Sequence, residues 1–129
     1  MLARDLIAQV IRTFYEELND VRDGGRLGDM EQRYGDLYVA YFQRSREFFL
    51  NNDIKEIKAF FSEDPDAVYK YDMLAELMYR EVKIVSDENL RQPMYLRIIE
   101  LYEVLDSLSM DFSFVRMNRV QELKNELKK

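Results

Sequence analysis

Apolar side chains recur every three or four positions along almost the whole chain, which is the spacing of one face of an α-helix. The clearest stripe lies near the N-terminus and consists of Ile7, Ile11, Phe14, Leu18 and Val21. No segment alternates with a period of two over the length of a strand without also fitting the helical period. The pattern therefore predicts an all-α protein.

Interruptions of this pattern divide the chain into five or six expected helices. They cover residues 2–22, residues 29–51, about ten residues from Asp53, residues 65–85, residues 93–108, and a last segment that carries Phe112, Val115, Val120, Leu123 and Leu127. A capping box at Asp53 and Glu56 and an N-cap at Asp111 or Ser113 support two of the starts. Pro93 is expected to open the fifth helix, because the residue before a proline disfavours the helical conformation.

Short connections between these helices favour antiparallel neighbours, in either an array of αα-hairpins or a compact helical bundle. With 129 residues, the chain is expected to form a single domain. Within it, the N-terminal helix (1–22) is joined by a glycine-rich hinge (23–28) to the helical body (29–129).

Tyrosines gather on one face of the second expected helix. Tyr34, Tyr38 and Tyr41 are spaced four and three positions apart, and Tyr71 belongs to a later helix with a similar pattern. Two interpretations stay open. The rings can form the edge of the core, with each hydroxyl reaching solvent or a carbonyl, or they can form an aromatic surface that binds a partner.

The N-terminal stripe also has two interpretations. The steps of four, three, four and three between Ile7, Ile11, Phe14, Leu18 and Val21 are those of a coiled-coil seam, and the hinge would let this helix leave the body. The sequence therefore allows a homodimer through the N-terminal helix. The alternative is that the stripe packs on the chain's own core.

A repeat-like pattern links the two tyrosine-bearing helices. The first helix of a tetratricopeptide repeat has an aromatic residue, Leu, a small residue and Tyr at the positions of Tyr34, Leu37, Tyr38 and Tyr41, and the spacing returns 37 residues later at Tyr71, Leu74, Ala75 and Met78. Residues 30–108 thus resemble two degenerate tetratricopeptide repeats. The chain also resembles small helical proteins of bacteria, which implies no activity. The repeat resemblance implies a packed array of helical hairpins that binds a peptide or protein.

Composition excludes several kinds of chemistry. The chain has no Cys and no His, so it cannot form a disulfide, a thiol nucleophile, a zinc site with Cys or His ligands, or a Ser-His-Asp triad. The segment from Asp20 to Glu31 has the length of a calcium loop, but Arg22 and Gly24 stand where two ligands are needed. The sequence therefore predicts no metal and no cofactor.

Charge and hydropathy bear on partners and location. A net charge of −6 argues against binding nucleic acid or an anionic membrane through a broad basic surface. No apolar run reaches the length of a membrane span, and charged residues interrupt the first apolar positions. We expect a cytoplasmic protein.

These patterns together predict a small, non-enzymatic interaction or assembly module. It would bind a protein or peptide through the aromatic helical face of Tyr34, Tyr38, Tyr41 and Tyr71. The alternative is an enzyme that depends on carboxylates, or a helical protein that binds a metal through Asp and Glu.

Overall fold

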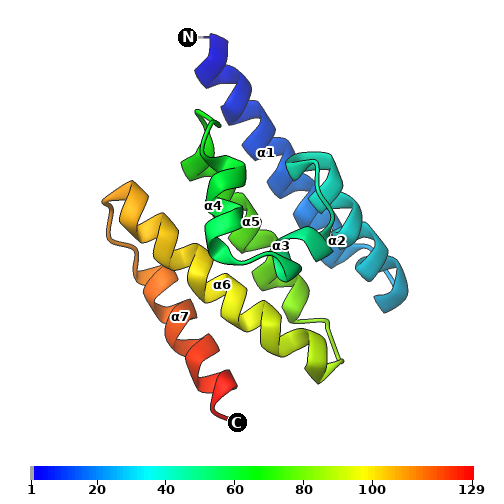
Figure 1. The fold of residues 1–129 in the computed structure, drawn as a ribbon. Coiled ribbons are helices and arrows are strands. Elements are labelled where there is room, and N and C mark those ends of the chain that lie inside the picture. Colours follow the sequence, from blue (N-terminus) through cyan, green and yellow to red (C-terminus); the bar gives the residue numbers. More distant parts are fainter. Residues whose placement is uncertain (1) are drawn as a thin grey trace.

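The computed structural model describes residues 2–129, with side chains for residues 6–26 and 28–129, and contains seven α-helices and no strand within that range (Figure 1). The helices are α1 (Leu2–Asp23), α2 (Leu27–Phe42), α3 (Arg46–Asn51), α4 (Ile54–Phe61), α5 (Ala67–Val82), α6 (Glu88–Ser109) and α7 (Phe114–Leu127). The all-α prediction is confirmed. The expected number of five or six helices is wrong by at least one.

The extra helix comes from a break that the sequence pattern does not signal. One helix is expected over residues 29–51, but the chain leaves the helical conformation after Phe42, and Gln43 adopts a left-handed conformation with φ of 59°. The Gln43 N–H donates to the Val39 carbonyl at 3.1 Å and closes α2. Neither glycine nor proline marks this turn, so the spacing of apolar residues predicts one uninterrupted helix across it.

Pro93 lies inside α6 and does not open it. The helix begins at Glu88, after Asp87, whose side chain accepts a hydrogen bond from the Asn89 N–H at 2.9 Å. Proline at this position removes one backbone donor, the one that would reach the Asn89 carbonyl. Asn89 is exposed, so water can satisfy that carbonyl.

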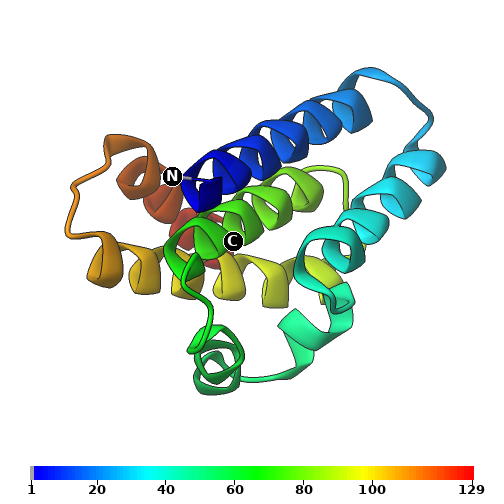
Figure 2. The ribbon, with the colours of Figure 1, turned by 90° about the horizontal axis from the view of Figure 1, so that it is seen from above.

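The core is built around α5 and α6, which pack against each other. Helices α1 and α2 contact α5, while α3, α4 and α7 contact α6. Figure 1 shows α1 and α2 on one side of this pair and α7 on the other, and Figure 2 shows α3 and α4 forming a separate short layer. The largest fully buried side chains are Tyr38, Tyr102, Phe14, Phe42, Phe49, Leu18, Ile57, Met73, Leu74, Leu77, Met78 and Met94.

Aromatic rings hold the two short helices in place. Phe48 of α3 and Phe60 of α4 lie with ring centroids 5.1 Å apart, and the Arg44 guanidinium covers both rings at 5.5 and 5.0 Å. Phe61 continues the cluster to Tyr71 of α5 at 4.9 Å. Helices of six and eight residues are too short to be stable alone, so this packing is what fixes them.

Across residues 2–129, no helix combines the length and the apolarity that crossing a bilayer requires.

Candidate functional site

The tyrosine face lies mostly in the interior. Tyr34, Tyr38 and Tyr71 are buried, Tyr38 completely, and Tyr41 is half-buried against Phe14 with ring centroids 5.0 Å apart. The structure therefore supports the interpretation of this face as core. Partner binding through it stays a prediction that the burial does not favour, because three of the four rings are enclosed.

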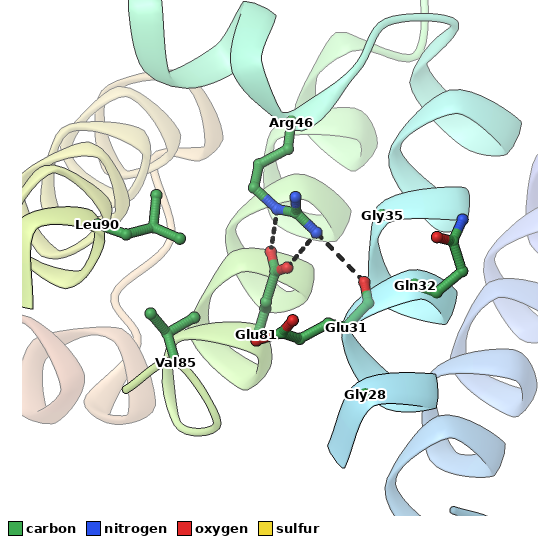
Figure 3. Close-up of a pocket in the computed structure, with 8 residues that line it drawn as sticks. All are labelled: Gly28, Glu31, Gln32, Gly35, Arg46, Glu81, Val85 and Leu90. Carbon is green, nitrogen blue, oxygen red and sulfur yellow. Dashed lines mark hydrogen bonds and ion pairs between the residues drawn. The ribbon is translucent and has the colours of Figure 1, made fainter. Parts of the chain in front are cut away.

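Tyr38 ends at a buried ion pair that joins three helices. Its hydroxyl donates to Glu81 Oε1 of α5 at 2.8 Å, and Arg46 Nε of α3 donates to the same oxygen at 3.0 Å. Arg46 Nη2 pairs with Glu81 Oε2 and also donates to the Glu31 carbonyl of α2 at 3.4 Å (Figure 3). A Cβ atom on Gly35 would lie 3.2 Å from Arg46 Nη2, so glycine leaves room for the guanidinium.

Burial governs the protonation of this cluster. Burial raises the pKa of Glu81, although the hydrogen bond and charge of Arg46 and the hydrogen bond from Tyr38 act in the opposite direction. Burial together with Glu81 raises the pKa of Tyr38 well above its ordinary value, so the hydroxyl keeps its proton and donates it.

A cavity of about 360 Å³ opens above the ion pair, between α2, the start of α6 and the end of α5. Its lining is Gly28, Glu31, Gln32, Gly35, Arg46, Glu81, Val85 and Leu90 (Figure 3). Both oxygens of Glu81 already accept hydrogen bonds or pair with Arg46. The cluster therefore acts as a structural tie between α2, α3 and α5.

A second polar cluster ties α5 to α6 and α7. Glu76 accepts from Arg80 Nε at 2.8 Å and from Arg119 Nη1 at 2.6 Å, and Arg119 Nη1 also donates to the Tyr102 hydroxyl at 2.9 Å. The Arg119 guanidinium lies 4.0 Å from the ring centroid of Tyr79. Burial alone would raise the pKa of Glu76, but the hydrogen bonds from Arg119 and Arg80 outweigh it and lower that pKa. Glu76 is therefore held as a carboxylate.

Among the residues with described side chains, no three or more acidic groups come together in a way that could hold a metal ion.

The N-terminal stripe packs mainly on the chain itself. Phe14, Leu18 and Val21 are buried against α2 and α5, while Ile7 and Ile11 are half-buried. The three buried positions are not available to a second copy in this fold. Among the described side chains of α1, the exposed large apolar ones are Leu6 and Val10, which lie beside the stripe.

The most exposed apolar side chains of the described chain lie in the connection between α6 and α7 and at the start of α7. Met110 is 88% exposed, Phe112 70% and Phe114 68%. We call this region the α6–α7 surface; it consists of Leu108, Met110, Phe112, Phe114, Val115 and Met117. The rings of Phe112 and Phe114 contact each other edge to face at 4.7 Å.

Sequence reasoning placed Phe112 and Val115 among the apolar positions of the last helix and did not identify this surface. In the structure Phe112 precedes α7 and is exposed, and Val115 lies on α7 with its side chain exposed. Only Leu123 of α7 is fully enclosed. The segment "MDFSFVRM" gave no separate signal, because Met110, Phe114 and Met117 also fit the helical period.

A groove of about 590 Å³ runs beside the α6–α7 surface. It is lined by Glu103, Asp106, Met110, Asp111, Phe112, Ser113, Met117, Val120, Gln121 and Lys124. Of the two caps that the sequence allowed, Asp111 and Ser113, it is Ser113 that caps α7, by accepting from the Arg116 N–H at 3.2 Å. The cap fixes where α7 begins, and it therefore fixes where the connection between α6 and α7 ends.

Comparison of the chain with protein-family models, curated proteins and solved structures found no match. The tetratricopeptide resemblance stays a prediction.

Proposed function

We propose that this protein is a non-enzymatic interaction module that binds a protein partner through the α6–α7 surface. The observation that carries the proposal is the gathering of six exposed apolar side chains around one connection. Exposed apolar side chains that gather beside a groove, as Met110, Phe112 and Met117 do, are typical of an interaction site. Methionine and phenylalanine suit such a site because they supply large, adaptable contact area.

The conformation and exposure of Met110 are a second reason to propose that the α6–α7 surface binds a partner. It ends α6 in a left-handed conformation with φ of 62°, where glycine or asparagine is preferred, and its side chain packs on little of the protein. Neither the backbone preference nor the packing of the fold explains a methionine there. Contact with a partner does explain it.

The polar clusters support binding over catalysis. Glu76 and Glu81 are enclosed carboxylates, and each is engaged by arginine side chains. A general base needs a carboxylate that is free to take a proton from a substrate. The carboxylate-dependent enzyme is thus the weaker candidate.

The test is affinity purification from cells that express the protein, using the full chain and two double variants. Met110→Ser with Phe112→Ser changes the α6–α7 surface, and Leu6→Ser with Val39→Ser is the matched control at exposed apolar positions elsewhere. Thermal unfolding checks that all three proteins fold.

We expect the wild type and the control to retain the same protein in near-stoichiometric amount, and the surface variant to lose it. The proposal fails if the folded surface variant retains every protein that the wild type retains, or if the wild type retains none.

A further inference from the structure

The groove beside the α6–α7 surface has two packed helices as its walls: α6 contributes Glu103 and Asp106, and α7 contributes Met117, Val120 and Lys124. On each helix these residues are three or four positions apart and so form one stripe along the groove. A third helix can lie between two such stripes with its own apolar face inward.

Among the residues that line the groove, the acidic ones outnumber the basic ones, and Arg116 lies beside them, where it donates to Asp106 and to the Asp111 carbonyl. Glu103, Asp106 and Asp111 line the groove, with Lys124 as the one basic lining residue. Arg116 pairs with Asp106 at 2.6 Å, whereas Glu103 and Asp111 form no ion pair with any residue whose side chain the structure describes. The C-terminal end of α6, at Ser109, adds the negative end of a 22-residue helix dipole.

We propose that the groove takes a basic amphipathic helix of a partner protein. The apolar face of that helix would cover Met110, Phe112 and Met117, and its basic side chains would lie against Glu103 and Asp111. This inference rests on the proposed function and adds the chemistry of the partner. A second copy of the same surface fits less well, because it would place acidic side chains against one another.

Synthetic helices of about 18 residues test the charge argument. The basic probe carries leucines on one face, lysines on the other and a single tryptophan; the acidic probe has glutamate in place of every lysine. The protein contains no tryptophan, so tryptophan fluorescence and anisotropy report on the probe alone. We expect the basic probe to bind at least about tenfold more tightly than the acidic probe and to weaken as salt is added.

Methionine methyl groups show where the probe binds. Met110 and Met117 belong to the surface, whereas Met73 and Met94 are fully buried and serve as internal controls. In methyl NMR spectra of the labelled full chain, we expect the basic probe to shift the signals of Met110 and Met117 and to leave those of Met73 and Met94 in place.

Charge reversal completes the test. Glu103→Lys with Asp111→Lys should weaken binding of the basic probe by about tenfold. The control Asp36→Lys, on α2, should leave it unchanged. Each of four results would overturn the inference: equal affinity of the protein for both probes, methyl shifts at methionines outside the surface, preferential binding of the protein to anionic lipid vesicles, or a dimer through this surface in light scattering. If the basic probe does not bind but the Met110 and Phe112 double variant still loses its cellular partner, the inference fails and the proposed function stands.

Discussion

Met110 and Gln43 are the non-glycine residues with positive φ in residues 2–129, at 62° and 59°. A side chain in this conformation costs about 1 kcal/mol relative to glycine. We expect Met110→Gly and Gln43→Gly each to raise the free energy of unfolding by about 0.5–1 kcal/mol in chemical denaturation, because both turns become unstrained.

The two variants should differ in binding. Met110→Gly removes a side chain of the α6–α7 surface and should lose the partner while gaining stability, whereas Gln43→Gly should keep it. Equal partner binding by both variants would mean that the exposed methionine has no part in recognition.

Glu76 and Glu81 lie on the same helix but should respond to pH in opposite ways. The pKa of Glu76 is below its ordinary value of 4.5, so its contribution to stability is present above that pH and is lost as the pH falls through the folded pKa. The pKa of Glu81 is above its ordinary value, so its contribution improves as the pH falls towards that range.

Glutamine variants measure this contrast. Relative to wild type, the stability deficit of Glu76→Gln should stay constant above about pH 4.5 and shrink as the pH falls below it, whereas the deficit of Glu81→Gln should grow as the pH falls from 7 towards 4.5. Urea denaturation at several pH values gives both curves, and parallel curves would show that the two carboxylates are not perturbed in opposite directions.

At the scale of elements, substituting the glycines of the connection between α1 and α2 tests whether glycine is needed there for flexibility. No glycine in residues 2–129 has a positive φ, and Gly28 lies inside α2 with nothing within 4 Å of an added Cβ. An added Cβ on Gly24 would come within 2.9 Å of the Asp20 carbonyl oxygen. Gly24 is therefore required by a close approach, and Gly28 is not.

We expect Gly28→Ala to raise the free energy of unfolding by about 0.5 kcal/mol through helix propensity, and Gly24→Ala to lower it. Thermal and chemical unfolding measure both effects. If alanine at both positions left stability unchanged, the connection would be a loose hinge, as the sequence alone suggests, and not a fixed turn.

Local chemistry made some elements predictable. The capping box at Asp53 and Glu56 forms as expected, with the Glu56 N–H donating to Asp53 at 2.9 Å, and Ser113 caps α7. The break at Gln43 was missed because neither glycine nor proline marks it, and the inclusion of Pro93 in α6 was missed because the Asp87 cap, which starts the helix before the proline, was not recognised. Spacing placed the tyrosines on one face but could not show what covers them, since the partner of Tyr38 is Glu81, 43 residues away.

At the scale of the whole molecule, protection from hydrogen exchange should decrease from the centre to α7. Eight side chains each of α5 and α6 are buried, but only Leu123 of α7 is. Local opening costs least where little apolar area is buried. We expect amides in the middle of α7 to exchange about 100-fold faster than those of α5.

The same exchange experiment connects the fold with the proposed site. A helix bound between α6 and α7 would bury Met117 and Val120 and so slow exchange in α7, with little change in α2. Protection of α7 equal to that of α5 in the free protein would show that the last helix is already fixed without a partner. In that case the exposed apolar side chains would belong to a rigid surface, and binding would require no ordering of α7.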